Sequence, residues 1–152
     1  MNESATTAAA TPAARRPGRG FYTVMASLIA LVVFIGFAPT FYLAPVFNAK
    51  PVTPLVALHG TLFTLWIIVF FTQVRLVAAR RVDVHRKLGA AAAFLAAAMP
   101  VVGVMAAIAS AKRGFTPPGG PPPLVFLAIP MMDMIVFPTL IGLALYFRRR
   151  SD

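Results

Sequence analysis

Four long stretches of this chain consist almost entirely of hydrophobic residues, and they constrain the fold more than any other feature of the sequence. The hydrocarbon core of a membrane contains no water to satisfy backbone groups, so a chain that crosses it must be helical or form a closed barrel. The stretches lack the alternation of apolar and polar residues that barrel strands require. Hydrophobic residues make up 59% of the chain and charged residues 12%, which excludes an ordinary soluble domain. The sequence therefore predicts an all-α integral membrane bundle.

Proline-rich and charged segments mark the expected ends of the four transmembrane helices. The helices are predicted at residues 21–43, 54–76, 84–111 and 124–147, and each is long enough to cross a hydrocarbon core of about 30 Å. They form one transmembrane domain, residues 21–150. Residues 1–20 are rich in Ala, Thr and Pro, a composition that predicts a disordered cytoplasmic tail. Asp83 is the expected N-cap of the third helix.

Lys and Arg residues are distributed unevenly among the connecting segments. The N-terminal tail carries three of the 14, the region between the second and third helices five, and the C-terminal end three. The two remaining loops share only Lys50, Lys112 and Arg113. Because cytoplasmic loops carry an excess of positive residues, both termini are predicted to be cytoplasmic. The net charge of +10 is explained by contact with anionic head groups, and we expect no binding to nucleic acid.

Small residues recur along the third predicted helix and indicate that it lies centrally in the bundle. Gly89, Ala93 and Ala97 are spaced four residues apart, as are Gly103, Ala107 and Ala111. Small side chains let helix backbones approach closely in lipid, so this helix is also a candidate surface for homo-oligomerisation. Pro100, Pro130 and Pro138 are expected to kink the helices that contain them.

Two ionisable residues lie inside the predicted spans, where such groups are costly and are functional candidates by default. His59 and Asp133 are expected roughly 9 and 13 Å below the outer face, depths at which their side chains can meet. His59 begins an aromatic face of the second helix that continues through Phe63, Trp66 and Phe70 to Gln73. His59, Gln73 and Asp133 therefore form a candidate intramembrane polar site. A packing face whose His and Gln bond to neighbouring helices explains the same pattern.

Two further residues, Arg75 and His85, are predicted to lie at the cytoplasmic boundary. Arg75 can extend its charged end to the head groups, and His85 lies beside Asp83 and ahead of two basic residues. Because His59 and His85 are expected at opposite faces of the membrane, they cannot both bind one iron. His59 alone, or two copies of it in a dimer, remains a candidate site for b-type haem.

Several classes of chemistry have no support in the sequence. The chain contains no cysteine, which excludes disulfides, thiolate metal sites and thiol catalysis. No Gly-rich phosphate loop, HExxH pair or Ser-His-Asp triad is present. We expect no catalytic residues, no metal site and no obligatory cofactor.

The segments Leu58-His59-Gly60, Trp66, Gln73-Val74-Arg75-Leu76 and His85-Arg86-Lys87-Leu88-Gly89 resemble a group of uncharacterised bacterial multi-pass membrane proteins. In that group a His-Gly helix is followed by a His-Arg-x-Leu-Gly start of the next helix. A more distant likeness connects them to haem-b membrane reductases. The resemblance covers residues 21–147, implies a bacterial inner membrane location and implies no settled activity.

Three functions are consistent with these features. The first is a non-enzymatic small membrane subunit or a binding protein for a lipid-soluble ligand. The second is a b-type haem electron carrier that uses His59. The third is a component of proton-coupled transport that uses His59 and Asp133.

Overall fold

The computed structural model describes residues 18–49, 51–117 and 119–147, and every regular element in this part of the chain is helical. The elements are α1 (Arg19–Phe37), the π-helix η1 (Ala38–Tyr42), α2 (Pro54–Ala78), α3 (Val82–Lys112), α4 (Pro123–Phe126) and α5 (Ala128–Phe147). Four helical segments in it are long and apolar enough to cross a membrane. The chain is therefore a multi-pass membrane protein with four helical spans, and its apolar helices contact lipid. Residues 1–17 of the predicted tail, residues 1–20, lie outside the described residues, whereas Arg19 and Gly20 already belong to α1.

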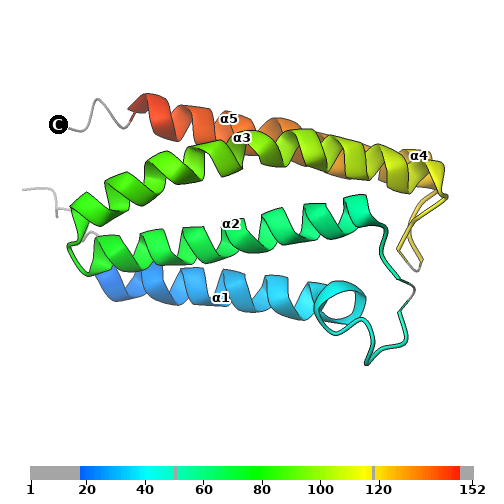
Figure 1. Cartoon of the computed structure of the whole chain (residues 1–152), viewed down its shortest axis with the longest axis horizontal. Helices are drawn as coiled ribbons and strands as arrows, with labels where there is room; N and C mark the ends of the chain where they lie inside the picture. The colour runs from blue at the N-terminus through cyan, green and yellow to red at the C-terminus, as the bar shows by residue number, and fades with distance from the viewer. Residues whose placement is uncertain (1–17, 50, 118, 148–152) are drawn as a thin grey trace, which may run out of the picture.

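The long helices lie side by side in the order α1, α2, α3, α5 (Figure 1). Helix α3 packs against both α2 and α5, in agreement with its predicted central position. Both ends of the helical region and the turn between α2 and α3 lie at one end of the bundle (Figure 1). We call this the basic end, because it carries Arg80, Arg81, Arg86 and Lys87. Its cytoplasmic location stays a prediction from the charge distribution.

The buried face of α3 differs from the predicted lines of small residues. The buried residues are Ala92, Ala96, Met99, Gly103 and Ala106, whereas Ala97 is exposed. Residues spaced strictly by four advance about 40° around a helix at each step, so a longer series leaves the contact line. The observed alternation of steps of four and three follows the line along which packed helices meet.

Helix α1 ends six residues earlier than predicted, and a wide π-turn replaces its last part. Pro39 lies in this turn and has no backbone N–H to donate to an α-helical bond. The amide of Leu43 instead donates to the carbonyl of Ala38 at 2.7 Å. The turn carries the Phe41 ring against Gly60 of α2 and sets the Tyr42 hydroxyl 2.9 Å from Thr64 Oγ1.

The fourth span is divided into α4 and α5, although the sequence predicts one continuous helix at residues 124–147. The break falls at Leu127, three residues before Pro130. Proline cannot donate to the carbonyl four residues earlier, and here that carbonyl belongs to Phe126. The α-helices continue through Pro100 and Pro138.

The start of α3 corrects the expectation for Asp83. The helix begins at Val82, and Arg81 is its N-cap, without a side-chain capping bond. The amide of His85 donates to the Arg81 carbonyl at 3.0 Å, which places Asp83 inside the first turn. There its negative charge still interacts favourably with the helix dipole.

At the opposite end of the bundle, Arg113 connects α3 to α2. Its guanidinium donates to Thr53 Oγ1 at 3.2 Å and to Ser110 Oγ at 3.3 Å. Thr53 is also the N-cap of α2 and accepts a bond from the Val56 amide. One side chain therefore holds the start of α2 against the end of α3.

Candidate ligand-binding site

The aromatic face of α2 lies on the more covered side of that helix. His59, Phe63, Trp66, Phe70 and Gln73 are all half-buried, whereas Leu65, Ile68 and Arg75 on other sides of α2 are exposed. The Trp66 ring meets the Phe137 ring of α5 edge to face, with centroids 5.2 Å apart. Thr61, Thr64 and Thr72 donate to carbonyls one turn earlier, as membrane-helix threonines commonly do. The aromatic and polar side chains of this face of α2 therefore point towards the other helices.

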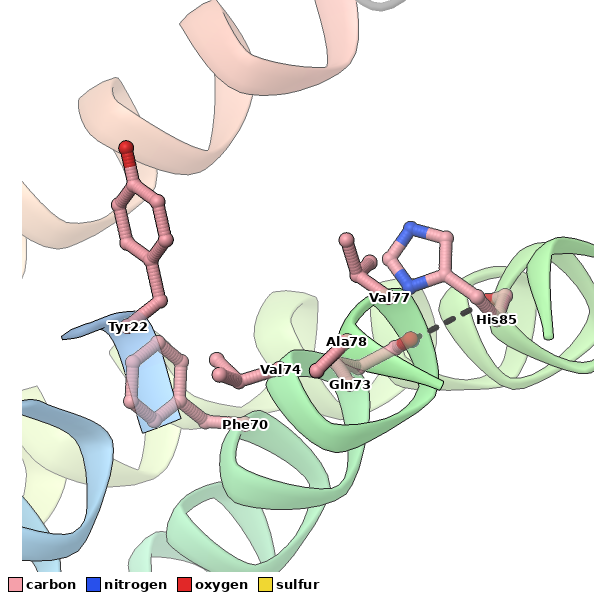
Figure 2. A pocket seen from close by; sticks show the side chains of 7 residues that line it. All are labelled: Tyr22, Phe70, Gln73, Val74, Val77, Ala78 and His85. Atoms are coloured by element: carbon pink, nitrogen blue, oxygen red, sulfur yellow. Dashed lines mark hydrogen bonds between the residues drawn. The ribbon is translucent and has the colours of Figure 1, made fainter. Parts of the chain in front are cut away.

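A cavity of about 350 Å³ lies along this face at the basic end. Seven residues line it: Tyr22 from α1, Phe70, Gln73, Val74, Val77 and Ala78 from α2, and His85 from α3. Figure 2 shows Tyr22 on one side and His85 on the other, with the α2 side chains between them. Most of the wall is therefore aliphatic or aromatic, and the polar groups are few.

Two polar atoms of this lining are buried and have no hydrogen-bond partner. The Gln73 Nε2 donates to the backbone carbonyl of His85 at 3.3 Å (Figure 2). Its other amide atom, Oε1, has no partner, and neither does His85 Nδ1. A buried polar atom without a partner costs roughly 1–3 kcal/mol. Both atoms have almost no exposed surface of their own, so a bound molecule would reach them after a small rotation of the Gln73 or His85 side chain, and the new hydrogen bond would remove this cost.

Glycine makes room for the Gln73 amide between the two helices. A Cβ atom on Gly89 of α3 would lie only 3.3 Å from Gln73 Nε2, closer than an ordinary van der Waals contact. The His-Arg-Lys-Leu-Gly segment and the preceding Gln thus meet at one place: His85 supplies the carbonyl and Gly89 the space. His59 and Trp66, which belong to the same sequence pattern, lie elsewhere along α2.

The donor and acceptor properties of the two atoms limit what can bind. An amide oxygen only accepts hydrogen bonds, so Gln73 Oε1 needs an O–H or N–H donor. The imidazole Nδ1 accepts or donates according to the tautomer. A phosphate or carboxylate oxygen does not satisfy Gln73 Oε1, whereas a hydroxyl satisfies it directly.

His59 and Asp133 lie in the other half of the bundle. The His59 ring packs on Phe63 with centroids 4.2 Å apart, and its Nδ1 is buried without a partner. Asp133 lies four residues before Phe137 and His59 seven residues before Trp66, so the contact between the two rings leaves them within about 5 Å of each other along the bundle axis. Within the described chain no hydrogen bond or ion pair joins His59 to Asp133, and Asp133 is exposed.

The residues proposed together from the sequence fall into two separate places. Gln73 lies fourteen positions after His59 on α2, which is about 21 Å along the helix. The His85 carbonyl accepts a hydrogen bond from Gln73, so His85 is about as far from His59 as Gln73 is. The two histidines are therefore too far apart to bind one metal ion. The part of the chain that the structure describes contains no group of three or more His, Cys, Asp or Glu suited to a metal.

Two features of the cavity were missed by sequence reasoning. Tyr22 was not singled out, because its role depends on where α1 packs, which no local pattern shows. His85 was predicted only to lie at the cytoplasmic boundary, and its half-burial and shielded Nδ1 were not foreseen. The signal that links it to Gln73 is Gly89, whose small size the contact requires.

Comparisons of the chain with protein-family models, with curated proteins and with solved structures found no match.

Proposed function

We propose that the protein binds a lipid-soluble ligand whose head group, bearing a hydroxyl or N–H donor, occupies the cavity at the basic end. The observation that carries this proposal is the pair of buried, unpartnered atoms, Gln73 Oε1 and His85 Nδ1, in an otherwise apolar lining. Sites for small molecules commonly combine apolar walls with a few placed polar groups. The role proposed for the protein is therefore to bind a ligand, as a small membrane subunit or carrier does, and not to catalyse a reaction.

The size and surroundings of the cavity indicate how such a ligand enters. About 350 Å³ accommodates a substituted ring but not a long hydrocarbon chain as well. Tyr22 and Val77 are 53% and 54% exposed, so the cavity is open at the bundle surface. A head group would lie against Phe70 and Val74, and its apolar tail would remain in the bilayer.

The test uses two ligands that differ only in the donor. 4-Dodecylphenol and its methyl ether, 4-dodecylanisole, have the same ring and tail, but only the phenol donates a hydrogen bond. Their binding to the full chain in detergent micelles is measured by isothermal titration calorimetry, with empty micelles as the reference. One neutral hydrogen bond contributes about 1 kcal/mol, so we expect the phenol to bind roughly five-fold more tightly.

Two variants test whether Gln73 accepts the hydrogen bond from the phenol. Gln73→Leu removes the acceptor and should make the two ligands equal. Thr72→Val is the matched control, because the Thr72 hydroxyl bonds to Ile68 within the helix and the residue does not line the cavity. Equal binding of both ligands to the unaltered protein, or a preference that survives Gln73→Leu, contradicts the proposal.

A further inference from the structure

Asp133 is an exposed carboxylate near the middle of a membrane span. It lies ten residues after Pro123 and fourteen before Phe147, the ends of the fourth span, which is about 15 and 21 Å along the helix axis. Its side chain is exposed, and it forms no hydrogen bond or ion pair with another residue that the structure describes. It is therefore separated from water at both membrane surfaces and from polar groups of its own bundle.

An acidic side chain at this depth is costly in lipid. Such residues almost always face a bundle interior or a water-filled cavity, and they pair with another group. Asp133 does neither within this chain. The structure thus leaves a carboxyl group without the polar or charged partner that its position requires.

The part of the chain that the structure describes does not supply that counterpart. The basic residues that the structure describes within or beside α2 and α3 lie at helix ends: Arg75, Arg80, Arg81, Arg86, Lys87, Lys112 and Arg113. Arg75 is closest to a membrane interior, yet it is only three residues from the end of α2. A second copy would present the same side chains at the same depths, because subunits related by an axis along the membrane normal keep their depth. His59 lies at a depth similar to that of Asp133, but it is half-buried on α2, where its ring packs on Phe63, so its place in the bundle does not match the exposed surface around Asp133.

The surface around Asp133 is suited to a helix. Ile129, Met132, Val136 and Leu143 of α5 are all exposed and follow the three-and-four spacing along which two helices pack. Asp133 lies beside Met132 at the edge of this apolar seam. A second helix laid along the seam would therefore place its own central residues next to the carboxylate.

We propose that Asp133 docks a transmembrane helix of a partner protein that carries a Lys or Arg near the middle of its span. A charged hydrogen bond between the two side chains would satisfy both groups where no water can. The apolar seam would supply the packing contacts, and the ion pair would select the partner. This assembly role is separate from ligand binding at the basic end and does not depend on it.

The test uses a synthetic partner in place of the natural one. The probe is a poly-leucine transmembrane peptide with Lys, Asn or Leu at its central position and an acceptor dye at one end. The protein contains no cysteine, so Thr116→Cys gives a single site for the donor dye. Energy transfer is measured in phosphatidylcholine vesicles, whose neutral surface gives the Lys peptide no general advantage. A central position keeps the depth equal for both peptide orientations.

We expect the Lys peptide to associate about ten-fold more strongly than the Leu peptide, as a charged hydrogen bond in lipid should allow. Asp133→Leu should bring the two within about two-fold of each other. This variant is not expected to unfold the protein, because Asp133 is exposed, and its helical circular dichroism serves as the check. Equal association of the Lys and Leu peptides overturns the proposal. So does an Asn peptide as strong as the Lys peptide, which would indicate a neutral hydrogen bond, and so does Asp133-dependent self-association that excludes the Lys peptide.

Discussion

Gly103 is the position where the packing of α3 against α5 can be tested most directly. It is buried, and a Cβ atom added there would overlap the Sδ atom of Met134. Gly103→Ala should therefore force Met134 or α5 itself to move. Added atoms in a well-packed interior typically cost about 1–3 kcal/mol, so α5 should bind less firmly to the rest of the bundle.

The size of this effect can be separated from the intrinsic helix preference of alanine. Gly142→Ala in α5 is the matched control, because nothing lies within 4 Å of its Cβ position. Alanine is favoured over glycine in a helix by about 1 kcal/mol, and this gain is common to both variants. The difference between them therefore measures the Met134 contact alone. Because the Met134 side chain is flexible, we expect a cost at the lower end of the range of about 1–3 kcal/mol, which lowers the equilibrium constant of folding by about five-fold for Gly103→Ala relative to Gly142→Ala.

The single tryptophan provides the assay. Trp66 contacts Phe137, one turn of α5 beyond Met134, so its fluorescence reports whether α5 is docked. Unfolding is followed by raising the mole fraction of dodecyl sulfate in mild-detergent micelles. The double variant Gly103→Ala with Met134→Ala should recover part of the loss, because the two sites share one contact. Equal midpoints for Gly103→Ala and Gly142→Ala would refute the reasoning.

Two other predictions concern orientation and cofactor content. Single cysteines placed at Asp83 and at Thr116 should react with an impermeant thiol reagent from opposite sides of the membrane, with Thr116 outside; reaction from one side would contradict the four-span arrangement. Protein purified in mild detergent from haem-replete cells should show no Soret band, because the His59 ring packs on Phe63 and His85 lies in α3, beside the opposite end of α2. A Soret band that disappears in His59→Ala would instead establish a haem site.

The four spans could be predicted because the hydropathy of a segment is the sum of contributions from its own residues and does not depend on where the other helices pack. The predicted start at Pro54 coincides with the start of α2, since proline and the Thr53 cap act locally. The ends of α1 and α4 were less predictable, because residues 38–42 and 127 include no charged residue that would mark the end of a span. Pro39 and Pro130 lie at or just after these places, but α3 and α5 continue through Pro100 and Pro138, so a proline alone does not show where a helix breaks.

Which residues of α3 are buried could not be predicted, for a different reason. Residues 90–93 and 96–98 are all alanine, so a stripe through Ala92 and Ala96 is as small as one through Ala93 and Ala97. The choice is made by the neighbours on α2 and α5, which the local pattern does not contain. The cavity depends on the same kind of information, because Tyr22 and His85 line it from helices far apart in sequence.

The order of the helices in the bundle also governs how the protein can be made. Helices α1, α2, α3 and α5 pack mainly against their neighbours in the chain, so each newly synthesised span meets its partner already in the membrane. Independently stable helices that associate in lipid suit such a stepwise assembly. Among the four spans, α1 and α5 lie at the two edges of the row, and Asp133 lies on the edge that is synthesised later.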